Sequence, residues 1–231
     1  MSDWNKLFLH EEIMLLALRD QEGTVEVGSM YKYAIGGAIL AELLLSNRIK
    51  VVATKRKKFV ELISSKPFGD PVIDGCIEKI QNAKRRASLE TWVSRFTGVK
   101  DLKNRIAIQL CRRGILRADE DKVFLIFTRK IYPEVNPEPE KKLIGRLQVA
   151  IYTDAEQIDP RTVVLLALAN SADLLKMSFD KKRLKERKKR IEKIINGDLT
   201  GHATKEAIEA MQAAVMVAVI TPTIVTTTLS T

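Results

Sequence analysis

One stretch of the chain, from Ala34 to Leu45, is apolar apart from a single charged residue, Glu42. A helix that is apolar on nearly all sides is buried inside a protein, because none of its faces suits water. The stretch is shorter than the roughly 20 apolar residues that a membrane-spanning helix needs. Gly36 and Gly37 are poor helix formers, so they indicate close approach of another backbone or a break. The pattern predicts a buried central helix over 30–46.

Periodic apolar positions elsewhere predict an otherwise mainly helical chain. Apolar residues recur at helical spacing over 7–19, 72–83, 89–96, 101–113, 140–152, 160–175 and 181–195. Runs rich in β-formers predict a hairpin over 48–53 and 59–64 with a basic tip, and further strands over 115–116 and 123–127. We expect Asp101 to cap the helix that follows it and Gly114 to end that helix. The fold class is mainly α, with short β-hairpins packed around the central helix.

The C-terminal segment 210–231 has no charged residue, but it contains Pro222 and many threonines. It also lacks the basic or aromatic residues that anchor a membrane span on its far side. We therefore expect a core helix over 205–220 followed by a tail over 221–231. The whole chain, 1–231, is predicted to form a single globular domain with its core at about 7–220.

Charge narrows the choice of partner. The chain has 39 Lys and Arg against 29 Asp and Glu, a formal net charge of +10 and a pI near 9.6. A surface this basic favours a polyanionic partner, either nucleic acid or a membrane rich in anionic lipid. Cys76 and Cys111 are the only cysteines, and the N-terminus does not resemble a secretory signal. We expect a cytoplasmic protein with both thiols reduced.

Catalytic motifs are scarce. The sequence His-Glu-Glu at 10–12 resembles the start of a metalloprotease motif, but Met14 stands where the second histidine is needed. His10 and His202 are the only histidines, which leaves no His-rich metal site. Asp173 lies in a predicted apolar helix, where a buried acid with a structural role is expected. We expect no catalytic residue, no metal and no cofactor.

The basic residues Lys100, Lys103 and Arg105 surround a predicted helix start that follows a glycine loop. Free backbone N–H groups and the positive end of the helix dipole make such a start a natural phosphate site. On spacing alone, the simpler explanation is that these side chains are solvated. The basic run 181–190 is likewise interpreted first as a solvated helix face.

Five sequence blocks, in order, resemble the Golgi phosphoprotein 3 (GPP34) family: LFLHEEIMLLALRDQEG, IGGAILAELLLSNRI, FGDPVIDGCIEKIQ, LKNRIAIQLCRRGIL and PRTVVLLALANSADLL. The resemblance implies a mostly helical single domain. It also implies a non-enzymatic peripheral membrane protein on the cytosolic face of a membrane, which is the Golgi in eukaryotic members. Its implied partners are phosphatidylinositol 4-phosphate and the cytosolic tails of membrane proteins, such as glycosyltransferases retained during trafficking.

The family's lipid pocket matches this chain only in part. Its pair of basic residues falls on Lys100 and Lys103, with Arg105 close by. Its tryptophan falls on Val27 and its other arginine on Gly36, so these two positions depart from the family. Lysine also lacks the bidentate fork that arginine offers to phosphate. We expect weaker headgroup selectivity, which Val27→Trp with Gly36→Arg would sharpen.

Two other interpretations remain open. Helix, short strand and hairpin over 101–127 form a winged-helix-like pattern, in which Lys103, Arg105, Arg112 and Arg113 would face nucleic acid. Against this, Ile106, Ile108, Leu110 and Ile115 leave little polar face for reading bases, so a nucleic-acid partner is the alternative. A structural or adaptor role with no ligand of its own is the third.

Overall fold

The computed structural model describes residues 6–18, 23–24, 30–54, 58–123 and 127–199. Those residues form the helices α1 (Leu9–Ala17), α2 (Met30–Leu45), α3 (Pro71–Gln81), α4 (Leu89–Thr97), α5 (Leu102–Arg112), α6 (Glu138–Tyr152), α7 (Pro160–Ser171), α8 (Leu175–Ser178), α9 (Lys181–Glu186) and α10 (Lys188–Ile195). They also form the strands β1 (Ile49–Ala53), β2 (Lys58–Leu62), β3 (Asp119–Val123) and β4 (Phe127–Ile131). The predicted mainly α fold with short hairpins is confirmed.

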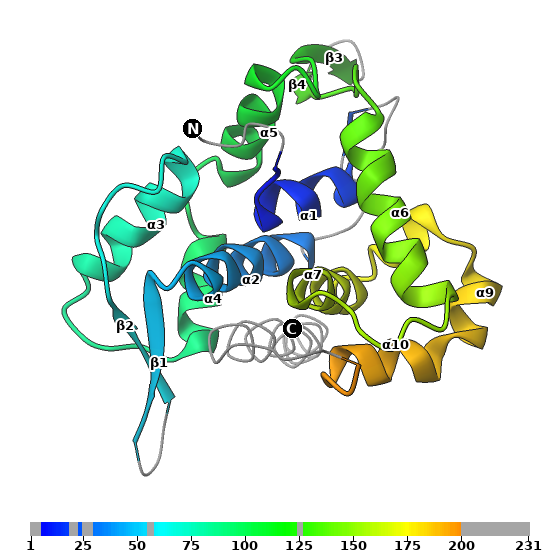
Figure 1. Ribbon diagram of the computed structural model, residues 1–231. Coiled ribbons are helices and arrows are strands. Elements are labelled where there is room, and N and C mark those ends of the chain that lie inside the picture. Colours follow the sequence, from blue (N-terminus) through cyan, green and yellow to red (C-terminus); the bar gives the residue numbers. More distant parts are fainter. Residues whose placement is uncertain (1–5, 19–22, 25–29, 55–57, 124–126, 200–231) are drawn as a thin grey trace, which may run out of the picture.

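Helix α2 lies at the centre of the fold and packs against α1, α4 and α7 (Figure 1). Every residue from Ala34 to Leu44 is buried, which confirms the predicted central helix. A Cβ atom placed on Gly36 would lie 2.7 Å from the carbonyl oxygen of Val93 in α4. The absence of a side chain at Gly36 therefore allows α2 and α4 to approach closely, as the glycine predicted. Buried apolar residues from Leu7 to Ile194 form one contiguous core around these helices.

Strands β1 and β2 form the predicted hairpin. They pair antiparallel, with Ile49 opposite Leu62 and Ala53 opposite Lys58. The hairpin extends away from the helices in Figure 1, and β2 contacts α3 and α4 at its base. The predicted basic tip includes residues 55–57, which lie outside the described residues.

The second hairpin lies elsewhere than predicted. Strands β3 and β4 pair antiparallel, and Val123 at the end of β3 stands opposite Phe127 at the start of β4. The predicted single strand over 123–127 is therefore wrong at its two ends, which belong to different strands, while residues 124–126 lie outside the described residues. In place of a strand over 115–116, Leu116 forms an isolated bridge with Glu134. A two-stranded ribbon is held by backbone hydrogen bonds, so a strand can be as highly charged as β3. The sequence analysis placed a strand at 123–127 because that run is apolar.

Two predicted helices are interrupted. Helix α7 ends at Ser171, and Asp173 follows it with φ of 62° and a side chain that is 62% exposed. The prediction of a buried Asp173 is wrong, because the helix ends before it. The predicted helix over 181–195 is divided into α9 and α10 at Arg187.

The predicted C-terminal helix over 205–220 and the tail lie outside the described residues, as does Val27. Within the part of the chain that the structure describes, no helix combines the length and apolar character that crossing a bilayer demands.

Candidate functional site

The predicted phosphate site lies at the turn between α4 and α5. Gly98 ends α4, and the backbone N–H of Val99 donates to the carbonyl of Phe96 at 3.1 Å. Val99 itself is buried, and its carbonyl accepts from the N–H of Leu102 at 3.3 Å. The buried Val99 thus fixes the turn in place, while the next residue, Lys100, is exposed.

Asp101 occupies the N-cap position of α5 but does not cap the helix with its side chain. Its backbone is left-handed, with φ of 54°, and its carboxylate accepts no capping hydrogen bond. The predicted capping role is therefore wrong, although the predicted helix start is right. The first turn of α5 contains no acidic residue, so the acid nearest to the positive end of the helix dipole is Asp101 at the N-cap.

The three predicted basic residues have different environments in the structure. Lys100 is exposed before α5, and Lys103 is half-buried in its first turn and engaged with another part of the chain. Arg105 instead reaches α3, where its guanidinium donates to the carbonyl of Pro71 at 2.7 Å. A Cβ at Gly75 would lie 3.6 Å from the guanidinium, which is an ordinary van der Waals separation, so the contact does not require a glycine there. Lys100 and Lys103 therefore lie at the start of α5, while Arg105 braces that helix against α3.

Gly36, the position matched to an arginine of the family pocket, faces the α4 backbone. Any side chain there would begin 2.7 Å from the Val93 carbonyl oxygen, closer than unstrained packing permits. The expectation that Gly36→Arg would sharpen headgroup preference is overturned, because the arginine could enter only by displacing α4.

A network of buried charges surrounds α1, and no motif in the sequence predicts it. His10, Glu11 and Glu12 are each 5% exposed or less. Glu11 pairs with Arg113 at the end of α5, and Glu12 pairs with Arg146 of α6 at 2.9 Å. Buried charges are retained only when paired, so these contacts fix α1 against helices far along the chain. The only signal in the sequence is the presence of charged residues inside an apolar stretch.

Arg161 of α7 joins the same network from the other side. Its guanidinium lies 2.9 Å from a carboxylate oxygen of Glu42, and it donates to the carbonyl of Leu7 at 2.7 Å. The other Glu42 oxygen accepts from the backbone N–H of Leu9 at 2.8 Å. The single charge in the central helix therefore ties α2 to both α1 and α7. Burial raises the pKa of Glu12, which Arg161 and Arg146 only partly offset.

His10 pairs with Asp70, the N-cap residue of α3. His10 Nε2 lies 3.4 Å from Asp70 Oδ2, a separation long for a hydrogen bond but short for an ion pair. Burial alone would lower the pKa of His10, but Asp70 outweighs it and raises the pKa. Burial alone would likewise raise the pKa of Asp70, yet His10 and the N–H of Ile73 hold it below its usual value. Each partner therefore favours the charged form of the other, and the pair anchors α1 on the start of α3.

The basic side chains of α5 do not form a free recognition face. Arg113 is held by Glu11 and by the carbonyl of Lys6, and Arg105 is held by Pro71. Arg112, the last residue of α5, is exposed. A helix that reads bases needs its polar side chains directed outward. The arrangement of α5 therefore disfavours the winged-helix alternative.

The fold and site together define a helical domain with a basic, phosphate-compatible helix start next to a tight turn. The chain belongs to the Golgi phosphoprotein 3 (GPP34) family, whose sequence model matches residues 9–211. It is 24% identical over 221 residues to vacuolar protein sorting-associated protein 74 of Schizosaccharomyces pombe. That alignment covers 82% of this chain and 65% of the relative. The resemblance seen in the sequence blocks is confirmed.

Proposed function

We propose that this protein is a non-enzymatic peripheral membrane adaptor that binds phosphoinositide headgroups, such as that of phosphatidylinositol 4-phosphate, at the start of α5. The observation that carries the proposal is the position of Lys100 and Lys103 around a helix N-terminus whose first turn has no acid. Phosphate oxygens would be attracted by both ammonium groups and by the helix dipole. Arg105 contributes by holding α5 against α3.

Attachment at this site is mainly electrostatic. Each basic residue near an anionic surface contributes about 1 kcal/mol, within a Debye length of about 8 Å at physiological salt. Lysine offers a point charge in place of a bidentate fork, and Gly36 has no space for an arginine. Binding should therefore depend more on negative charge than on headgroup identity.

The adaptor role rests on family membership. The relative in S. pombe is named for vacuolar protein sorting, and the family for the Golgi. We propose that this protein acts on the cytosolic face of a membrane in trafficking, the Golgi membrane if the source is eukaryotic, and contacts the cytosolic tails of membrane proteins. The chain spans 65% of the relative's length, so partners of the remaining part are not carried over.

A vesicle panel tests the lipid-binding function. Purified protein is mixed with phosphatidylcholine vesicles alone, or with added phosphatidylserine or phosphatidylinositol 4-phosphate, over a series of salt concentrations. We expect binding to both anionic vesicles, a modest preference for the phosphoinositide, and a steep fall with salt. Binding that persists unchanged in high salt would indicate apolar insertion. A gel shift with DNA and RNA under the same conditions, if tighter than vesicle binding, would favour the nucleic-acid alternative.

A further inference from the structure

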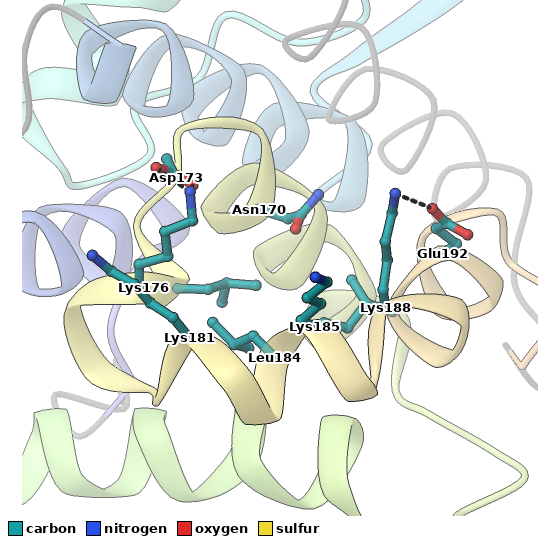
Figure 2. Close-up of a pocket in the computed structure, with 10 residues that line it drawn as sticks. Asn170, Asp173, Lys176, Lys181, Leu184, Lys185, Lys188 and Glu192 are labelled. Carbon is teal, nitrogen blue, oxygen red and sulfur yellow. Dashed lines mark hydrogen bonds and ion pairs between the residues drawn. The ribbon is translucent and has the colours of Figure 1, made fainter.

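A second basic site lies in the other half of the protein, far along the chain from α5. The end of α7 and helices α8, α9 and α10 enclose a pocket of about 380 Å³ (Figure 2). Four of its lining residues are lysines, namely Lys176, Lys181, Lys185 and Lys188, and we call it the lysine pocket. Its volume lies within the range of about 300–1,000 Å³ that is typical of small-molecule sites.

The basic run 181–190 is divided between two faces by residue type. Its arginines dock onto α6: Arg183 stacks 4.6 Å from the centre of the Tyr152 ring, Arg187 donates to the Tyr152 carbonyl at 3.1 Å, and Arg190 donates to the Ala150 carbonyl at 2.8 Å. These contacts fix the orientation of α9 and α10. The run is therefore not simply the solvated face that its composition suggested.

The lysines on the other face are directed toward the pocket. Figure 2 shows Lys185 and Lys188 rising from α9 and α10 on the side of Asn170, opposite α6, while the Lys181 side chain runs along the side where Lys176 lies. Lys182 and Lys189 belong to the same run but do not line the pocket, and both are exposed. The docking arginines thus determine which lysines line the pocket.

The charges of the lysine pocket are incompletely balanced. Lys176 lies 2.6 Å from a carboxylate oxygen of Asp173, and Lys188 lies 3.8 Å from one of Glu192. Lys181 and Lys185 have no hydrogen-bond or ion-pair partner among the residues that the structure describes. Two ammonium groups therefore remain for an outside anion, and Asn170 adds a side-chain amide to the pocket lining. Leu184 and Ile191 supply an apolar wall beside them.

We propose that the lysine pocket binds a phosphate monoester. Such a group carries a charge of about −1.5 to −2 at neutral pH and has three acceptor oxygens, which matches two unpaired ammonium groups and an amide. Leu184 and Ile191 would contact the carbon part of the ligand. The same chemistry is offered by a soluble phosphate ester and by a lipid with a terminal phosphate. The site is separate from Lys100 and Lys103, so it stands whether or not those residues bind a headgroup.

Two double variants with equal loss of charge test the proposal. Lys181→Ser with Lys185→Ser empties the pocket of its unpaired ammonium groups, whereas Lys182→Ser with Lys189→Ser removes two lysines outside it. Calorimetric titration with glycerol 3-phosphate should give equal affinity for the unsubstituted protein and the control. The pocket variant should bind at least about tenfold more weakly, since hydrogen bonds to charged groups are lost. Thermal unfolding of both variants checks that the fold is retained.

A second arm uses phosphatidylcholine vesicles with and without phosphatidic acid, whose headgroup is also a phosphate monoester. Weaker binding to the phosphatidic acid vesicles in the pocket variant alone, without measurable binding of glycerol 3-phosphate, would support the proposal with a lipid as the source, since Lys100 and Lys103 are unchanged in that variant. Loss of glycerol 3-phosphate binding in the pocket variant, with no change in its vesicle binding, would support a soluble phosphate ester as the ligand. Equal weakening by both double variants, or no binding in either arm, would overturn the proposal.

Discussion

Gly36 illustrates how the absence of one side chain shapes both the core and the candidate site. Its hydrogen lies where a Cβ would meet the Val93 carbonyl oxygen at 2.7 Å, and a backbone atom in a packed helix cannot easily move aside. The glycine was predicted to mark a close backbone approach, and the α2–α4 contact confirms this. The same contact leaves no room for a larger side chain at this position.

We predict that Gly36→Ala lowers the free energy of unfolding by about 1–3 kcal/mol, the usual cost of overpacking a core. Gly145 in α6 is the matched control, because a Cβ there meets no atom within 4 Å. Gly145→Ala should raise stability by about 0.5–1 kcal/mol, since alanine is the better helix former. Chemical denaturation measures both. A neutral or stabilising Gly36→Ala would show that α4 yields easily at this point.

Among the elements, α1 combines apolar packing against α2 with charge pairs that reach it from distant parts of the chain. Its pairs with α3, α5 and α6 join residues separated widely in sequence, and no local periodicity reveals them. The helices themselves were largely predicted, because apolar spacing and end residues such as Gly114 are local signals. The position of β3 and the break between α9 and α10 at Arg187 were not predicted. The first is a highly charged strand, and the second accompanies tertiary contacts with the carbonyls of Tyr152 and Ala150.

The candidate site, like the helices and strands, was predicted from the sequence in part. The helix start and its lysines follow from sequence and family resemblance, and the structure places both there. That Arg105 would turn toward Pro71 depends on the packing of α5 against α3, which only the fold reveals. The lysine pocket likewise depends on which side chains of one basic run face α6.

The His10–Asp70 pair predicts how stability changes with pH. The folded pKa of His10 is raised above 6.5, so its contribution is complete below pH 6.5 and is lost as pH rises through the folded pKa. The folded pKa of Asp70 lies below 3.8, so its contribution is present above pH 3.8 and is lost as pH falls through the folded value. The pair therefore stabilises the protein most between these limits.

The measurement is the free energy of unfolding from pH 5 to pH 9 for the unsubstituted protein and for His10→Gln. As pH rises from 6.5 to the folded pKa of His10, the unsubstituted protein should lose about 1.4 kcal/mol of unfolding free energy for each pH unit. His10→Gln should not show this loss. Glu11, Glu12 and Glu42 are unchanged in the variant, so the difference between the two curves isolates His10. Parallel curves would mean that His10 is not protonated in the folded protein.

For the whole molecule, a net charge of +10 is distributed between structural and exposed groups. Many arginines, including Arg105, Arg113 and Arg161, are occupied in holding helices together. Lys100 is exposed at the α4–α5 turn, and Lys181 and Lys185 face the lysine pocket. The proposed membrane attachment therefore depends on where a few lysines lie more than on the total charge.

The most direct test of this claim compares two charge reversals in binding to phosphatidylcholine vesicles that contain phosphatidylinositol 4-phosphate. One variant combines Lys100→Glu with Lys103→Glu. The control combines Lys141→Glu with Lys142→Glu, two exposed residues of α6. Thermal unfolding verifies the folds, and Lys100→Glu alone replaces the first variant if Lys103→Glu disturbs α5. We predict that the first variant binds at least about thirtyfold more weakly, from about 1 kcal/mol for each lysine lost, while the control changes little. Equal weakening by the two variants would contradict the account, because it would mean that bulk charge, and no particular site, attaches the protein to the membrane.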